Sequence, residues 1–113
     1  MKIKLLKSKI HRATVTDTCL DYEGSVSIDK RLLEASNIVP YEKVHILNVT
    51  NGNRLETYAI PSSTKGNVCI NGAAAHLVDT NDIVIIVSYA QMTIEDGVSF
   101  KPTIIYPNEL NEI

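Results

Sequence analysis

The sequence has no tryptophan, few other aromatic residues and only two cysteines. Aromatic residues make up 5% of the 113 positions, so a hydrophobic core has to be built from Ile, Val, Leu and Ala. The cysteines show neither CxxC spacing nor a Cys/His ligand pattern, which argues against a disulfide framework or a zinc site. We therefore expect Cys19 and Cys69 to be small buried thiols in a reducing compartment.

Long apolar runs and excess positive charge are also absent. Charged residues interrupt the apolar stretches at the N-terminus, so we expect neither a secretory signal peptide nor a membrane span of about 20 residues. A formal net charge of −2 argues against a general nucleic-acid binder, which needs clustered Lys and Arg. The sequence lacks P-loop, GxSxG, HExxH and dinucleotide motifs. These features predict a cytoplasmic protein that binds neither nucleic acid nor membrane.

Five of the eleven Lys and Arg residues lie in the first twelve positions: Lys2, Lys4, Lys7, Lys9 and Arg12. Lysine on an exposed strand edge discourages pairing with other chains, and we interpret the first three in this way. Residues 2–20 are expected to be extended, with a bulge at Leu5–Leu6 where the apolar pattern changes face. A second alternation over 9–15 places Lys9 and His11 on the same face.

The middle of the chain predicts one helix and one hairpin. A helix is expected over 30–36, with Asp29 as its N-cap and Asn37 as the left-handed residue that ends it. Asn51-Gly52 lies between two β-rich runs, 44–50 and 54–60. This dipeptide predicts a tight hairpin with positive φ at both turn residues.

The remaining segments predict further strands and turns. Strands are expected at 68–70, 83–87 and 101–106, with the apolar run 83–87 buried on both faces. A turn with one helical turn is expected over 71–76, and the polar tail to residue 113 is expected to be loose. Six or seven short strands with one or two small helices favour a mainly β fold closed into a barrel.

The segment Tyr22-Glu23-Gly24-Ser25 has two interpretations. As structure it is a turn, which Gly and Ser favour. As chemistry, a serine hydroxyl can attack the carbonyl that precedes it if the backbone is strained, and glycine tolerates such strain. The resulting ester can undergo β-elimination to dehydroalanine, which hydrolyses to a pyruvoyl group and ammonia.

Over nearly its whole length, the chain resembles the bacterial pyruvoyl-dependent aspartate 1-decarboxylases. The matching segments are Lys9-Ile10-His11-Arg12, Tyr22-Glu23-Gly24-Ser25, Asn48-Val49-Thr50-Asn51-Gly52, Arg54, Thr57-Tyr58-Ala59-Ile60, Asn71-Gly72-Ala73-Ala74-Ala75-His76 and Asp82-Ile83-Val84-Ile85-Ile86. The resemblance implies a six- to seven-stranded double-psi β-barrel and a homotetramer with active sites between subunits. It also implies that the single domain, residues 1–113, cuts itself into chains 1–24 and 25–113.

The resemblance further implies the reaction, in which L-aspartate loses its α-carboxyl group as CO2 and gives β-alanine for pantothenate and coenzyme A synthesis. The pyruvoyl group made from Ser25 forms a Schiff base with the substrate amine and accepts electrons, so neither a metal nor pyridoxal phosphate is required. By the same resemblance Tyr58 donates the proton and His11 has a supporting role. The implied substrate-binding residues are Lys9, Arg54, Thr57, Asn71, Gly72, Ala73 and Ala74.

Several alternatives remain open. A non-catalytic β-barrel binding module could contain a Gly-Ser turn and would stay uncut. A swapped-hairpin DNA-binding protein would need a basic face, against which the pI of about 5.9 argues. A different pyruvoyl decarboxylase would cut itself but act on another amino acid. The resemblance does not decide which of Lys9 and Arg54 binds which carboxylate, or whether cleavage needs a maturation factor.

Overall fold

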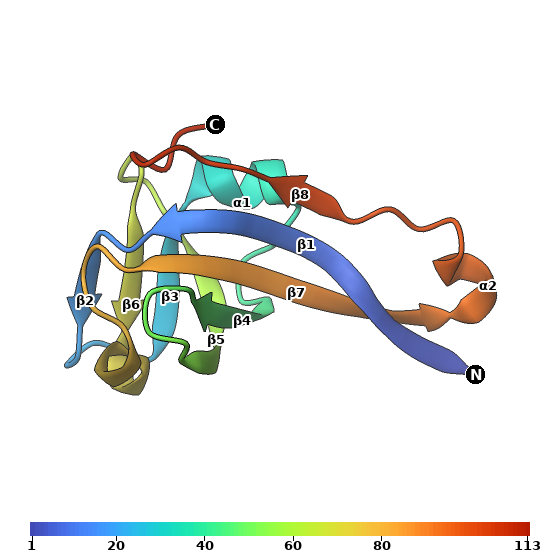
Figure 1. Cartoon of the computed structure of the whole chain (residues 1–113), viewed down its shortest axis with the longest axis horizontal. Helices are drawn as coiled ribbons and strands as arrows, with labels where there is room; N and C mark the ends of the chain where they lie inside the picture. Colours follow the sequence, from blue (N-terminus) through green and yellow to red (C-terminus); the bar gives the residue numbers. More distant parts are fainter.

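Eight strands form one hydrogen-bonded sheet in the computed structural model, which describes all of residues 1–113 (Figure 1). The strands are β1 (Lys2–Thr14), β2 (Asp17–Cys19), β3 (Ser25–Asp29), β4 (Lys43–Asn48), β5 (Arg54–Ser62), β6 (Val68–Asn71), β7 (Ile83–Thr93) and β8 (Thr103–Ile105). Three short helices complete the fold: α1 (Lys30–Ser36), the 3-10 helix η1 (Gly72–Leu77) and α2 (Ile94–Gly97). No helix is long and apolar enough to cross a membrane.

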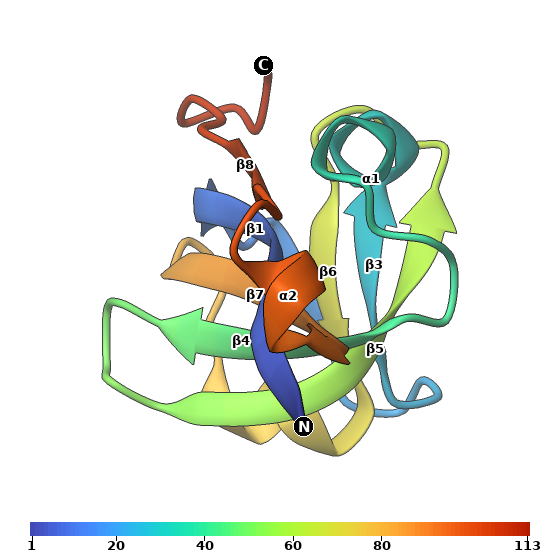
Figure 2. The same cartoon turned by 90° about the vertical axis from the view of Figure 1, so that its right-hand side faces the viewer.

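The sheet order is β2-β6-β3-β5-β4-β7-β1-β8, with mixed strand directions. β3 runs parallel to β5 and antiparallel to β6, whereas β7 runs antiparallel to both β1 and β4. In Figure 2, β3 and β6 run across the direction of β4, so the sheet is strongly bent. The sequence predicted six or seven strands and one or two helices. The strand expected at 101–106 is confirmed as β8, whereas β3 and the short helix α2 were not predicted, and the extended segment 2–20 divides into β1 and β2.

The core is aliphatic, as the scarcity of aromatic residues requires. One row of paired residues crosses four strands and contains Ile10, Ile86, Ile46 and Leu55. All four are buried, and α1 covers the same core with Leu32 and Leu33. Burying each such side chain contributes roughly 1.5–3 kcal/mol relative to leaving it exposed. The alternate residues of these strands point to the outer face of the sheet.

A first irregularity in β1 is a register shift at Lys7, slightly beyond the bulge expected from the sequence. Lys7 does not lie on a solvated edge as predicted, because its ammonium pairs with the Glu42 carboxylate at 3.1 Å and also donates to the Asn37 carbonyl. Lys2 and Lys4 are exposed, as predicted. The ion pair connects β1 to the segment between α1 and β4.

A second irregularity in β1 is a register shift at His11 and Arg12, where Arg12 has a φ of +66°. Lys9 and His11 flank the buried Ile10 and are both half-buried, in agreement with the predicted shared face. The alternation predicted over 9–15 also put Ala13 on the face of Lys9 and His11. It is wrong at this position, because the extra residue of the bulge turns Ala13 into the core.

The hairpin expected at Asn51-Gly52 joins β4 and β5, but its turn is longer than predicted. Residues 49–53 connect the strands, and Gly52 alone among them has a positive φ, +81°. Asn48 explains the difference: its Oδ1 accepts from the Thr50 N–H at 3.0 Å, and its Nδ2 donates to Asp82 at 2.8 Å. A loop held by a buried side chain replaces the two-residue turn.

The C-terminal tail, predicted to be loose, is held against the sheet. Asn111 is buried. Its Oδ1 accepts from the Thr14 N–H, and its Nδ2 donates to the carbonyls of Thr14 and Gly66, each at 2.8 Å. The apolar run 83–87 is also less buried than predicted, since Ile83 and Ile85 are only half-buried.

β1 and β7 extend well beyond the other strands as a two-stranded arm that ends in α2 (Figure 1). The arm makes the molecule elongated, with extents of 43 × 27 × 24 Å. Several apolar side chains at its end are exposed, among them Met1, Ile94, Val98 and Phe100. Clustered exposed apolar groups are typical of a surface that contacts another protein.

Asp29 ends β3 and caps α1, as the sequence predicted. Its Oδ1 accepts from the Arg31 N–H and Nε, and its Oδ2 accepts from the Gly66 N–H at 2.7 Å. Asn37 ends the helix with a φ of +61°, also as predicted. Burial by itself raises the pKa of Asp29, but the hydrogen bonds from Gly66 and Arg31 together outweigh it, and the pKa is lowered.

We expect Asp29→Asn to lower the free energy of unfolding by about 2 kcal/mol at neutral pH, because an amide N–H would then face the Gly66 N–H. Because the pKa of Asp29 is lowered in the folded protein, the stabilisation from its carboxylate is complete above the unfolded-state pKa of about 3.9. This stabilisation is lost as the pH falls through the folded-state pKa. Denaturant unfolding should show that the free energies of unfolding of the wild type and Asp29→Asn converge as the pH is lowered. Glu34→Gln, which changes an exposed carboxyl group on α1, is the control. A difference in unfolding free energy between the wild type and Asp29→Asn that stays constant down to low pH would contradict this role of the Asp29 carboxylate.

Candidate functional site

Ser25 is the first residue of β3 and is only 1% exposed. Its hydroxyl accepts a hydrogen bond from Asn71 Nδ2 at 3.0 Å and donates to the Glu23 carbonyl at 3.2 Å. Asn71, on β6, is the residue paired with Ser25 across the sheet, and it is buried too. The arrangement holds the Ser25 hydroxyl in a defined position beside the peptide bond that joins it to Gly24.

Gly72, which begins η1, lies directly against the backbone of Gly24. A Cβ atom on Gly72 would be 2.7 Å from Gly24 Cα and 2.9 Å from Gly24 N, and the φ of Gly72 is +73°. Both the close approach and the positive φ require glycine at this position. The turn before Ser25 is thus packed on backbone rather than on side chains, and Ala73 and Ala74 follow along η1.

β5 lies on the other side of β3 and carries two further predicted site residues. Extending the parallel β3–β5 register back by one and two residues places Ser25 beside Tyr58 and Gly24 beside Thr57. Tyr58 pairs with the exposed Lys43 on β4, whereas Thr57 lies on the opposite face, as the sequence predicted. Both residues therefore lie at the end of β3 where the Gly24–Ser25 bond is found.

Tyr58 packs against Tyr41, which the sequence analysis did not single out. Their ring centroids are 6.1 Å apart, and the rings are tilted by 30°. Tyr41 follows Pro40 in a turn and has a φ of +69°, which is rare for a bulky side chain. Its N–H donates to the Ala59 carbonyl at 2.7 Å, which fixes the turn against β5. No sequence motif marks this contact, because it joins residues from separate elements.

Asn71 has two further partners that the sequence analysis also missed. Its Nδ2 donates to Ser27 Oγ at 3.0 Å, and its Oδ1 accepts from the Cys69 thiol at 3.2 Å. Cys69 is half-buried and Cys19 is exposed, so the expectation of two buried thiols is wrong. Burial first, and then the nearby Asp17 carboxylate, raise the pKa of Cys69, so it remains a thiol at neutral pH. Period two along β6 was the signal that could have found this pair.

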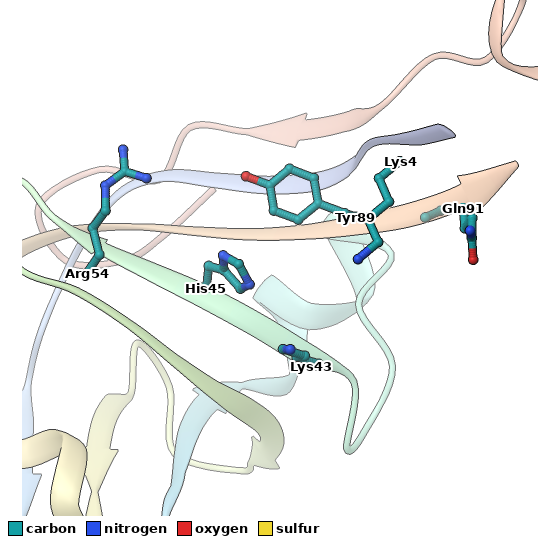
Figure 3. A pocket seen from close by; sticks show the side chains of 7 residues that line it. Lys4, Lys43, His45, Arg54, Tyr89 and Gln91 are labelled. Carbon is teal, nitrogen blue, oxygen red and sulfur yellow. The ribbon is translucent and has the colours of Figure 1, made fainter. Parts of the chain in front are cut away.

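Arg54 lines a separate cavity of about 590 Å³ on the outer face of the sheet (Figure 3). The lining residues are Lys4, Lys43, His45, Arg54, Tyr89, Ala90 and Gln91. In Figure 3, Arg54 lies at one end and Lys4 and Gln91 lie toward the other, with Tyr89 and His45 between them. Glu56 pairs with Lys43 at 3.5 Å and with His45 at 3.2 Å. Lys4 and Arg54 have no carboxylate partner, so the cavity is positively charged.

Lys9 lies on the outer face of the sheet beside this cavity, whereas His11 lies at the β1 bulge. Lys9 pairs with Val87 on β7, and Val87 in turn pairs with His45 on β4. His11 lines another cavity, of about 420 Å³, where its ring packs edge-on against Tyr106 with centroids 5.6 Å apart. The His11 Nδ1 atom is buried without a hydrogen-bond partner.

Within one chain most of the predicted site residues form two groups; His11 belongs to neither, and Ala73 and Ala74 follow Gly72 on η1. We call the first the cleavage-site group; it comprises Gly24, Ser25, Thr57, Tyr58, Asn71 and Gly72. The second is the outer-face pair of Lys9 and Arg54. Arg54 is four residues from Tyr58 along β5, about 13 Å at the usual strand rise. The sheet order separates the β1 strand of Lys9 from β3 by β7, β4 and β5. No hydrogen bond or shared cavity joins the two groups.

Comparisons with known proteins agree along the whole chain. The family model described as aspartate decarboxylase matches residues 1–113. An aspartate 1-decarboxylase from Campylobacter fetus subsp. fetus is 53% identical over 113 residues, which cover 100% of this chain and 98% of that protein. One from Dehalococcoides mccartyi is 53% identical over 110 residues, 96% of this chain and 89% of that protein. One from Campylobacter jejuni subsp. jejuni is 55% identical over 111 residues, 98% and 88% of the two chains. The chain therefore belongs to the aspartate decarboxylase family.

Proposed function

We propose that this chain is a self-processing aspartate 1-decarboxylase that converts L-aspartate into β-alanine and CO2. The observation that supports this most directly is the buried Ser25 hydroxyl, held between Asn71 and the Glu23 carbonyl immediately after Gly24. In a member of the aspartate decarboxylase family, this arrangement has a chemical use beyond forming a turn. The β-alanine product would supply pantothenate and coenzyme A synthesis.

Self-cleavage would proceed by an acyl shift from nitrogen to oxygen. Ser25 Oγ attacks the Gly24 carbonyl carbon, the C–N bond breaks, and the Ser25 nitrogen is freed as Gly24 becomes esterified to Oγ. Loss of the Ser25 α-proton then breaks the Cβ–Oγ bond and releases Gly24 as a carboxylate that keeps the oxygen. Water converts the dehydroalanine that remains into a pyruvoyl group and ammonia. The products are chains 1–24 and 25–113.

The residues present fit a pyruvoyl group at position 25. Gly72 leaves no side chain against Gly24, so the new chain ends can separate without an obstructing Cβ. The Asn71 amide already donates to the side-chain atom of residue 25. The pyruvoyl group would supply an electron sink for decarboxylation at an amino-bearing carbon, the chemistry that pyridoxal phosphate provides elsewhere.

The other residues take roles that match their chemistry. Tyr58, adjacent to Ser25 by register, would donate the proton that replaces the lost carboxyl group, with Tyr41 packed against its ring. Arg54 and Lys9 would bind the substrate carboxylates, Arg54 through its planar fork and Lys9 as a point charge. Thr57 would polarise the Gly24 carbonyl. Asn71, Gly72, Ala73 and Ala74 would surround the substrate, and His11 would support the site.

A site between two copies of the chain would bring the two groups together. The segment before Ser25 carries exposed acidic side chains, Asp17, Asp21 and Glu23, none of which forms an ion pair. The cavity around Arg54 is positively charged, so the two surfaces are complementary between copies. The exposed apolar end of the arm gives further contact area. We propose a homotetramer with active sites between subunits.

The barrel closure expected from the sequence is part of the same proposal. Only Val15 and Thr16 separate β1, near one end of the sheet order, from β2 at the other end. The Thr16 N–H donates to the Val68 carbonyl of β6 at 2.9 Å. This short connection supports a double-psi β-barrel, in which the bent sheet closes on itself.

Ser25→Ala should fold but remain uncut and inactive, because it removes the attacking oxygen. Intact-mass spectrometry of the wild-type protein should show fragments 1–24 and 25–113, the larger lighter by one ammonia than a fragment that begins with free serine. A cleaved Ser25→Ala protein would contradict the route. A wild-type chain that stays whole after long incubation, alone and in host-cell extract, would favour a non-catalytic barrel.

Tyr58→Phe should mature normally yet lose decarboxylation by at least about 100-fold, the usual contribution of a positioned acid. Fragment masses and CO2 release from L-aspartate measure the two properties separately. Tyr106→Phe, which keeps a ring against His11, is the matched control and should retain its rate. Full turnover in Tyr58→Phe would assign the proton to another donor.

Complementation tests the site between copies. Ser25→Ala and Arg54→Ala should each be inactive alone. Coexpressed in equal amounts, they should recover roughly a quarter of wild-type activity, because random assembly gives that share of interfaces with both residues intact. Recovery should be absent if each chain carries a complete site of its own.

A further inference from the structure

We infer that Cys69 is a positioning residue for self-cleavage: its thiol orients the Asn71 amide, which in turn holds the Ser25 hydroxyl. The inference rests on the proposed self-cleavage and adds a residue that the cleavage chemistry itself does not require. Three contacts carry it: Cys69 Sγ to Asn71 Oδ1 at 3.2 Å, and Asn71 Nδ2 to the hydroxyls of Ser25 and Ser27, each at 3.0 Å.

The donors and acceptors of this network select one orientation of the amide. An asparagine side chain offers two N–H donors and one carbonyl acceptor. Both donors of Asn71 are used by Ser25 and Ser27, and the acceptor is used by Cys69. In the flipped orientation, the N–H groups would face sulfur, a weak acceptor. The Ser25 hydroxyl would then have to donate to Oδ1 and leave the Glu23 carbonyl.

The fold supplies the thiol where the amide needs it. Cys69 and Asn71 are two residues apart on β6 and therefore share a face of the strand. β2 covers the free edge of β6 and pairs Asp17 with Cys69 and Cys19 with Asn71. Burial and the Asp17 carboxylate keep Cys69 protonated by raising its pKa, and only the protonated sulfur can donate to Oδ1.

The orientation matters because cleavage needs a fixed nucleophile. With Asn71 donating to Ser25 Oγ, the hydroxyl proton points to the Glu23 carbonyl and the oxygen is held in one position next to the Gly24–Ser25 peptide bond. Loss of the Cys69 donor leaves the amide free to turn, so fewer molecules hold Ser25 in the reactive position at any moment. The effect falls on the rate of maturation.

The test compares Cys69→Ala, Cys69→Ser and Cys19→Ala during maturation of freshly made full-length chain. Cleavage is followed by intact mass over time, and melting temperatures are measured in the uncut Ser25→Ala background to separate rate from stability. We expect Cys69→Ala to cleave about fivefold more slowly, the effect of one modest hydrogen bond. Cys69→Ser keeps a donor, and its cleavage rate should remain within about twofold of the wild-type rate. Cys19→Ala removes the neighbouring thiol and should cleave at the wild-type rate.

Equal cleavage rates in Cys69→Ala and the wild type would overturn the inference and leave the proposed function intact. Equal slowing in Cys69→Ser and Cys69→Ala would also overturn it, because the sulfur would then act through packing and not through its proton. A wild-type chain that never cleaves would overturn the proposed function itself. Rescue by serine with unchanged melting temperatures is the result that establishes the positioning role.

Discussion

Buried polar side chains must find hydrogen-bond partners, and at both ends of β3 this requirement decides how the surrounding segments are placed. At the start of the strand, Asn71 joins β6 to the hydroxyl of Ser25. At its end, Asp29 joins α1 and the segment around Gly66. β3 is thereby fixed between β5 and β6, and the peptide bond at its first residue cannot shift without breaking a buried network.

The same constraint separates the chemistry into two parts. The cleavage-site group lies where three strands and η1 meet, with backbone packed on backbone at Gly24 and Gly72. Lys9 and Arg54 lie on the outer face of the sheet, in or beside a positively charged cavity. A chain of 113 residues has little interior volume for both a core and a substrate. The proposed site between two copies would enclose the substrate without enlarging the chain.

Local sequence signals predicted the elements whose structure is decided locally. Asp29 and Asn37 mark the ends of α1 because capping depends on residues within one turn of the helix. The hairpin at Asn51-Gly52 was placed correctly, but its turn was not, because Asn48 obtains its partner Asp82 from the turn before β7. Lys7, Ala13 and Asn111 were assigned to the wrong environments for the same reason. Their partners, or the bulge that turns them, come from pairing between segments distant in the chain.

The sequence by itself determined the family resemblance, the Gly24–Ser25 pair and the chemical types of the residues proposed around it, because these are properties of residues and their spacing. Only the tertiary structure decided which of them lie together. It set Asn71 and Cys69 behind Ser25, packed Tyr41 against Tyr58, and placed Arg54 in a cavity farther along β5. Those neighbours follow from strand register and sheet order, which arise from long-range backbone pairing and burial of the aliphatic core and have no local signature.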